Sequence, residues 1–186
     1  MGTRSIHVFP CVNKYGRWKD DDRKWVMQYI QFDGYPSEQI YLFALDFKDR
    51  YRHTFQVRHD TYSKECMDEF FEYLRAYYYL RSFETYHSIN NVSFVNTYGL
   101  GDLTKYGCDY SYEWYDNREN NKNSIGSFEN DPMIYLTITK VSSNTRYSLS
   151  FEEFIAICEE KKWDPRSIGN AIDDAVNSLE KIQFHN

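Results

Sequence analysis

Features that would mark a membrane protein or a metalloprotein are missing from this sequence. No apolar run is long enough to cross a bilayer and no signal peptide opens the chain, so we expect a cytoplasmic protein without membrane contact. The cysteines are few, widely spaced and without a C-x-x-C pair: Cys11, Cys66, Cys108 and Cys158. This spacing indicates reduced, buried thiols and predicts neither a zinc site nor a disulfide framework.

An excess of positive charge is also missing. The chain has 22 Lys and Arg residues against 28 Asp and Glu residues, which gives a formal net charge of −6. A protein that binds duplex DNA or an anionic membrane needs a basic patch, so direct nucleic-acid binding is disfavoured. The charge does permit a partner that is itself basic, such as a nucleic-acid-handling protein.

Catalytic signatures are the third absence. The glycine-bracketed turn Gly99-Leu100-Gly101 lacks the remainder of a phosphate-binding loop, and a lone G-x-G pattern carries little information. No nucleophile–base pair or metal-ligand spacing is present, because the histidines stand apart from one another. We therefore predict a protein that is not an enzyme and that has no metal ion and no cofactor.

Aromatic residues, by contrast, are abundant. They make up 19% of the chain, with 18 Tyr and 13 Phe, and hydrophobic residues make up 41%, which indicates a globular protein with a real core. Tyrosine has an apolar body and a polar tip, so an excess of it suits half-exposed faces and contact surfaces.

The stretch from Trp25 to Ser37 organises the rest of the chain. Its first eight residues alternate with a period of two and are rich in aromatic and β-branched side chains, which predicts a half-buried strand. Asp33-Gly34 is a turn signal, and Pro36 keeps Tyr35 extended. Ser37 is then expected to cap a helix. This corner sets the fold, or it forms a site with Asp33 and Tyr35 at the strand end.

The remaining patterns predict one α+β domain over residues 1–186, with an antiparallel sheet of about five strands packed against about four helices. Runs of strands followed by runs of helices, rather than strict alternation, favour this class. Ser150 and Glu153 form a capping box, and Asp164-Pro165 starts the last helix, so residues 150–184 form a helical pair that packs as a subregion. Strands are expected at 6–12, 25–32, 109–115, 133–141 and 146–149, with a further short one at 92–95. Helices are expected at 37–50, at 60–81, from 151 to the break that begins at Trp163, and at 165–182.

Two short motifs resemble a group of small phage and prophage proteins. These are the opening Met1-Gly2-Thr3-Arg4-Ser5 and the segment Asp33-Gly34-Tyr35-Pro36, followed in the same order by Gly99-Leu100-Gly101-Asp102 and the Tyr-rich strand 110–115. This chain departs from that group after Pro36, where Ser37-Glu38-Gln39 replaces glycines. The resemblance implies an origin in a mobile genetic element and the cytoplasm of an infected or lysogenic bacterium. The resemblance implies no catalytic residue in this chain.

Inhibitory binding to a host protein is the function that these observations favour. Carboxylates imitate phosphates and tyrosines supply rigid contact area, so an acidic, Tyr-rich surface suits a basic groove such as that of a CRISPR effector. An anti-CRISPR-like inhibitor that acts by steric occlusion or acidic mimicry is the expectation. The candidate contacts are acidic or aromatic: Asp20, Asp21, Asp22, Tyr77, Tyr78, Tyr79, Glu119, Glu129 and Asp131.

Other functions stay open. A small ligand or substrate site near Arg4, Asp33, Tyr35 and Asp102 is the main alternative, because these residues fall near strand ends and Arg is suited to bind a phosphate or carboxylate. Single-strand nucleic-acid binding would use the aromatic strand 110–115, although the negative charge opposes it. A structural or assembly role is the remaining alternative.

Overall fold

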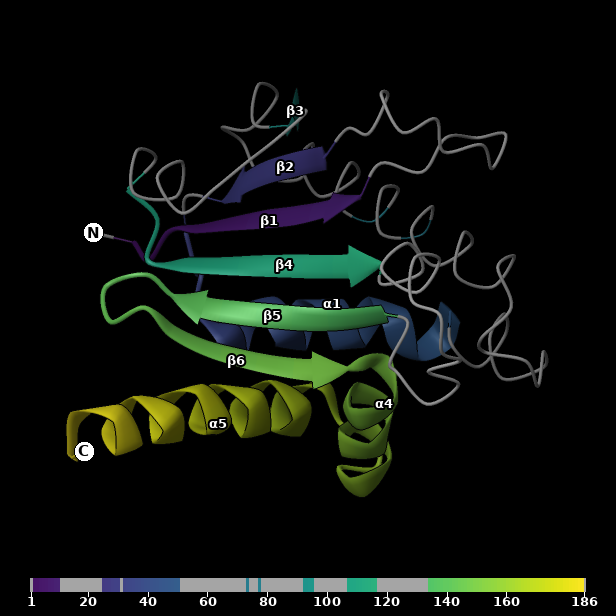
Figure 1. Cartoon of the computed structure of the whole chain (residues 1–186). Coiled ribbons are helices and arrows are strands. Elements are labelled where there is room, and N and C mark those ends of the chain that lie inside the picture. The colour runs from purple at the N-terminus through teal and green to yellow at the C-terminus, as the bar shows by residue number, and fades with distance from the viewer. Residues whose placement is uncertain are drawn as a thin grey trace, which may run out of the picture.

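The computed structural model describes residues 2–10, 25–30, 32–50, 73, 77, 92–95, 107–116 and 134–185. These residues form an α+β structure in which six strands make one sheet and the helices pack beside it (Figure 1). The strands are β1 (Ser5–Pro10), β2 (Trp25–Ile30), β3 (Val92–Val95), β4 (Tyr110–Asp116), β5 (Ile134–Lys140) and β6 (Thr145–Ser150).

The sheet is mixed rather than antiparallel. Its order is β3-β2-β1-β4-β5-β6, and every neighbouring pair is antiparallel except β1 and β4. The expected antiparallel sheet is therefore wrong at its centre, where Ser5 pairs with Tyr110 and both strands run the same way. A parallel pair needs a long crossover connection, and the chain between β1 and β4 is long enough to supply it. Burial of Ser5–Phe9 on both faces agrees with this central position.

Three helices have defined bounds in the described residues, against the four expected: α1 (Pro36–Arg50), α4 (Phe151–Glu160) and α5 (Pro165–His185). The helix expected at 60–81 lies outside the described residues except at Tyr73 and Tyr77, which are both helical. The starts of α4 and α5 confirm the sequence signals. Ser150 and Glu153 bond reciprocally, and Asp164 accepts a bond of 3.0 Å from the backbone N–H of Ser167.

Helix α1 begins one residue earlier than predicted. Pro36 occupies the first helical position, where its missing N–H costs nothing, and its fixed φ suits the helix. The carbonyl oxygen of Tyr35 accepts bonds of 3.0 Å from the N–H groups of Glu38 and Gln39. Ser37 lies inside the helix, so the prediction that it is the cap is wrong.

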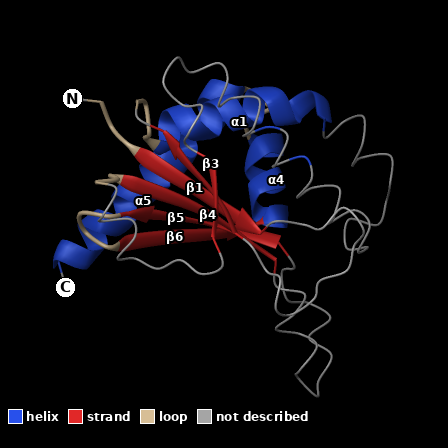
Figure 2. Ribbon diagram, turned by 90° about the horizontal axis from the view of Figure 1, so that it is seen from above, coloured by secondary structure: helices blue, strands red, loops and turns tan. Residues whose placement is uncertain are grey.

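One core joins the sheet to all three helices. Figure 2 shows α1 along one side of the sheet, and its buried side chains meet those of β4 and α5. The alternation of β4 sends Tyr110, Tyr112 and Trp114 into this core. Its other buried members include Phe9, Ile40, Phe43, Phe47, Leu136, Ile138, Leu149, Phe154, Ile168, Ile172 and Val176.

Phe43 lies at the centre of an aromatic group within this core. Its ring centroid is 5.3 Å from that of Trp114 and 5.6 Å from that of Tyr77, which it meets edge to face. Tyr77 also lies 6.0 Å from Tyr73, ring to ring. Such pairs add stability beyond the area that they bury, by about 0.5–1.5 kcal/mol each.

Helices α1 and α5 cross closely at Gly169. A Cβ at this position would lie 2.5 Å from the carbonyl oxygen of Ser37, so a larger residue would push the helices apart. Beside the crossing, Arg166 donates to Glu38 and its guanidinium carbon lies 3.9 Å from the ring centroid of Tyr41. Glycine therefore fixes the distance between the two helices at this end of α5.

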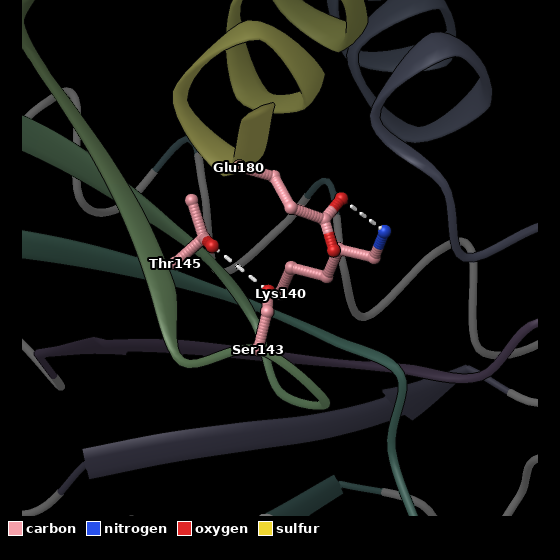
Figure 3. A network of polar contacts seen from close by, with 4 residues as sticks. All are labelled: Lys140, Ser143, Thr145 and Glu180. Carbon is pink, nitrogen blue, oxygen red and sulfur yellow. Dashed lines mark hydrogen bonds and ion pairs between the residues drawn. The ribbon is translucent and has the colours of Figure 1, made fainter. Parts of the chain in front are cut away.

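A polar contact fastens the other half of α5 to the sheet. Lys140 at the end of β5 reaches toward α5, where its Nζ lies 2.5 Å from Oε2 of Glu180 (Figure 3). The nearby turn is closed by the hydroxyls of Ser143 and Thr145, 2.8 Å apart. The hydrogen bond to Glu180 is the main reason that the pKa of Lys140 is raised. The ammonium is therefore charged at neutral pH, as the ion pair requires.

Candidate functional site at one end of the sheet

Three segments that are distant in sequence meet where β1 and β4 begin and β2 ends, at the left of Figure 1. Ser5 pairs with Ile30 on one side and with Tyr110 on the other. The residues just before β1, between β2 and α1, and just before β4 therefore lie together. We call this region the sheet end and define it by Arg4, Phe32–Tyr35 and Gly107–Asp109.

Asp109 ties the start of β4 to Arg4. Its carboxylate oxygen Oδ2 accepts a bond of 2.8 Å from the backbone N–H of Arg4, and its own N–H donates to the Arg4 carbonyl oxygen at 2.9 Å. The carbonyl oxygen of Asp109 accepts from the N–H of Val141 at 2.9 Å. One residue therefore connects three neighbouring chain segments.

The Asp-Gly-Tyr-Pro motif packs directly on the chain before β1. The N–H of Gly34 donates to the carbonyl oxygen of Thr3 at 3.0 Å. A Cβ at Gly34 would lie 2.8 Å from the carbonyl carbon of Arg4 and 2.9 Å from the nitrogen of Ser5. Both neighbours are backbone atoms that have no room to move aside. Glycine is required at position 34 for this close approach.

Two buried polar side chains bind the backbone of the Asp33-Gly34 segment. The hydroxyl of Tyr112 donates to the carbonyl oxygen of Gly34 at 2.7 Å, and Nε2 of Gln39 donates to the carbonyl oxygen of Asp33 at 2.7 Å. Asp33 itself has φ of 56°, a left-handed conformation that Asp and Asn tolerate better than most residues. The loop backbone is thus fixed at several successive positions.

Two aromatic side chains stand exposed on this fixed loop. Phe32 is 52% exposed and Tyr35 is 37% exposed, and Asp33 between them is also exposed. We call residues Phe32–Tyr35 the aromatic loop. Leu45, at 50%, is the other large hydrophobic side chain exposed among the described residues, and it lies on α1. Rigid, exposed aromatic residues beside a charge are typical of protein contact surfaces.

Arg4 is half-buried at the sheet end, with its guanidinium over Gly107. A Cβ at Gly107 would lie 3.2 Å from Nη1 of Arg4, and Gly107 has φ of +63°. The ion pairs between described residues join Lys140 to Glu180, Lys161 to Glu160 and Arg166 to Glu38, and none of them includes Arg4. Within the part of the chain that is described, this guanidinium has no carboxylate partner.

Two neighbours of Arg4, Cys108 and Tyr29, are protonated at neutral pH. Burial raises the pKa of the Cys108 thiol to about 11, and the nearby Asp109 carboxylate adds to that shift while Arg4 opposes it. Burial likewise raises the pKa of the Tyr29 hydroxyl, again against the effect of Arg4. Neither group supplies a negative charge to Arg4 at neutral pH. Cys108 is also a poor nucleophile, because only the thiolate reacts.

A buried polar group lies just inside the sheet end. The ring of His7 stacks on that of Tyr112 with centroids 4.5 Å apart and planes inclined by 7°. Oγ of Ser5 lies 3.5 Å from Nε2 of His7, but both side chains are buried, at 0% and 2% exposed. A serine beside a histidine is the composition of a nucleophile–base pair. Because both side chains are buried, a substrate in solution cannot reach them.

The structure brings together part of the ligand site that the sequence suggested. Arg4, Asp33 and Tyr35 all belong to the sheet end, but no ion pair between the described residues joins Arg4 to Asp33. Asp102 lies outside the described residues. Asp109 is the acidic residue found beside Arg4, although the sequence pattern predicted it inside the strand that begins at Tyr110 in the structure. Its position directly before the alternating strand was the signal that could have identified it.

Of the predicted partner contacts, only Tyr77 lies in the described residues. Tyr77 is 7% exposed and packs against Phe43, so its ring is not available to a partner, contrary to the prediction. The other candidates, namely Asp20, Asp21, Asp22, Tyr78, Tyr79, Glu119, Glu129 and Asp131, lie outside the described residues. A site with Asp33 and Tyr35 at this corner was one of the two alternatives that the sequence left open, whereas the exposure of Phe32 was not predicted.

The described residues include neither a metal-binding cluster nor a membrane-spanning helix. They contain no group of three or more His, Cys, Asp or Glu side chains placed to hold a metal ion. Among the helices that are described, none combines the length and the apolar character needed to cross a membrane. Comparison with known proteins found no matching family model, no matching curated protein and no matching solved structure.

Proposed function

We propose that this protein is a binding protein of a mobile genetic element that inhibits a host protein in the bacterial cytoplasm, and that the aromatic loop contacts the partner. The proposed partner is a basic nucleic-acid-handling protein, such as a CRISPR effector. The chain acts by being bound, without turning over a substrate.

The observation that carries the proposal is the exposure of Phe32 and Tyr35 on a backbone that is already fixed. Hydrogen bonds from Gly34, Tyr112 and Gln39 hold the loop before any partner arrives. A rigid loop loses little conformational entropy on binding, so more of the contact energy appears as affinity. Aromatic side chains are the residues that most often dominate such energy.

Charge supports a basic partner. The chain carries a net charge of −6, and Asp33 stands exposed between the two aromatic side chains. Complementary charge would steer a basic partner toward this loop and increase the association rate. The aromatic residues favour steric occlusion over acidic mimicry, because a surface that imitates phosphates needs regularly spaced carboxylates rather than two apolar rings.

The test is a binding experiment with matched variants. The tagged protein is used to pull down purified CRISPR effector proteins from the bacteria that carry related elements, and nuclease activity of the retained effector is then measured. Phe32→Ala combined with Tyr35→Ala is expected to weaken retention by at least about tenfold, since two contact aromatics typically cost 1.4 kcal/mol or more.

Leu45→Ala is the matched control. Leu45 has almost the same exposed fraction as Phe32 but lies in the third turn of α1, about 14 Å along the helix axis from Pro36. It should leave retention unchanged. Equal loss in both variants would indicate nonspecific adhesion, and retention of no effector by the unmodified protein would remove the proposed partner class.

A further inference from the structure

The guanidinium of Arg4 is a donor without an acceptor in the described part of the chain. It is half-buried, it lies against Gly107, and the ion pairs between described residues leave it out. Arginine offers a planar fork of N–H groups that matches the two oxygens of an oxyanion. An unpaired fork in a partly buried position is therefore suited to a ligand.

The adjacent carboxylate is already engaged. Asp109 directs Oδ2 to the backbone N–H of Arg4 at 2.8 Å instead of to the guanidinium. This contact places a negative charge near the site without occupying the fork. The local charge of Arg4 and Asp109 together is then close to zero, so a singly charged anion is accommodated better than a doubly charged one.

Partly apolar surface continues from the guanidinium. Tyr29 and Val141 are half-buried and pack against a small cluster of Ile6, Val8 and Cys108 on the sheet face opposite to the main core. The Tyr29 hydroxyl and the Cys108 thiol lie close enough to Arg4 for its charge to lower their pKa values against the larger effect of burial. A ligand bound to Arg4 would therefore contact a neutral, largely apolar wall.

We propose that Arg4 forms a binding site for a small monocarboxylic acid with an apolar body, held by the guanidinium above Gly107 and packed against Tyr29. The site is independent of the proposed contact with a host protein, which uses the aromatic loop. No covalent step is involved. A carboxylate is favoured over a phosphate, because a phosphate dianion would be repelled by Asp109.

The experiment is a titration of the full chain, labelled with ¹⁵N, with sodium benzoate as the probe. Sodium chloride keeps the ionic strength constant, and sodium phosphate is titrated in parallel. Saturable shifts are expected at the amide of Gly107 and at the Arg4 side chain with benzoate. Arg4→Lys keeps the charge but loses the fork, and should weaken binding by about tenfold.

Arg146→Gln is the matched control. Arg146 is exposed on β6, and the alternation of the strands places it on the same sheet face as Arg4, so the substitution removes an equal charge nearby. It should leave the benzoate titration unchanged, whereas Arg4→Gln should abolish it. Gly107→Asn is a second test of the site that leaves Arg4 unchanged. Asn tolerates the positive φ of position 107 but places a Cβ 3.2 Å from Nη1 of Arg4.

Each outcome of these titrations supports or overturns the proposed site. Linear, non-saturating shifts with benzoate, or equal losses in Arg4→Gln and Arg146→Gln, would overturn the site. Binding of phosphate as tight as that of benzoate would overturn the assignment to a monocarboxylate. If Arg4→Gln does not fold, loss of the saturable shift in a folded Gly107→Asn supports the site, and its retention there counts against it.

Discussion

The hydroxyl of Tyr112 donates a hydrogen bond of 2.7 Å to the carbonyl oxygen of Gly34, across 78 positions of sequence. Tyr112 is 1% exposed, so the bond is sheltered from water. It links the central strand β4 to the loop that presents Phe32 and Tyr35. The position of the exposed aromatic loop therefore depends on a side chain in the core.

Tyr112→Phe should separate this hydrogen bond from the packing of the ring. The variant retains the stack on His7 but leaves the carbonyl of Gly34 without its donor, at a cost of about 1–2 kcal/mol in the free energy of unfolding. Chemical denaturation measures this loss. Tyr35→Phe is the control, because Tyr35 is exposed, and it should change stability by less than about 0.5 kcal/mol.

Gly169→Ala should disturb the crossing of α1 and α5. The added Cβ meets the carbonyl oxygen of Ser37 at 2.5 Å, so overpacking should outweigh the better helix propensity of alanine and cost about 1–3 kcal/mol. Asn170→Ala changes the next, exposed position and should be neutral or slightly stabilising. Thermal unfolding of both variants makes the comparison, and an equal melting temperature for the two would contradict the close contact.

Asp173 on α5 should make stability depend on pH in an identifiable direction. Burial is the main reason that its pKa is raised, Asp174 adds to the shift, and Lys140 opposes it. A raised folded-state pKa means that ionisation opposes folding, so the carboxyl favours the folded state at low pH and loses that contribution as pH rises through its pKa. Asp173→Asn should therefore stabilise the protein at pH 7, by about 0.5 kcal/mol.

The advantage of Asp173→Asn over the unmodified protein should shrink as the pH is lowered toward the usual Asp range, about 4. Asp49→Asn is the control, because Asp49 is exposed on α1 and is not among the groups that shift the pKa of Asp173. Urea unfolding at a series of pH values gives the comparison. A constant difference between Asp173→Asn and the unmodified protein at all pH values would show that Asp173 does not titrate differently on folding.

The two described cysteines should resist alkylation in the folded protein. Burial raises the pKa of Cys108 to about 11 and that of Cys158 to about 12. About one Cys108 thiol in a thousand is then ionised at pH 8, and its burial restricts the reagent further. Peptide mass spectrometry after iodoacetamide treatment should find both unmodified until denaturant is added. Rapid labelling of either in the native state would show that its surroundings open.

Local signals in the sequence were the reliable part of the prediction. The capping box of Ser150 and Glu153 and the Asp164-Pro165 start of α5 act within one turn of helix, so they do not depend on distant residues. The alternation of β4 likewise predicted that Tyr112 and Trp114 share one face, and the structure shows that this face is the buried one. These features are decided by neighbours in the chain, which the sequence displays.

Long-range pairing was the part that local patterns did not contain. Nothing within β1 or β4 identifies the other as its neighbour, so their parallel pairing went unpredicted. The role of Asp109 depends on the same pairing, since it contacts Arg4 only because the two strands align. Tyr77 is one of three consecutive tyrosines that were candidate contacts, and the sequence did not show which of them would be buried; packing against Phe43 places Tyr77 in the core.

The parallel pairing of β1 with β4 has a consequence for biosynthesis. Strand β1 leaves the ribosome before its partner β4 (Tyr110–Asp116), which follows more than a hundred residues later. Until then the edge of β1 that will meet β4 has no native neighbour, and closing so long a loop is slow. The nascent chain therefore completes the middle of its sheet only after residues 110–116 have been made, and a chain that stops before them should leave the earlier strands open to proteolysis.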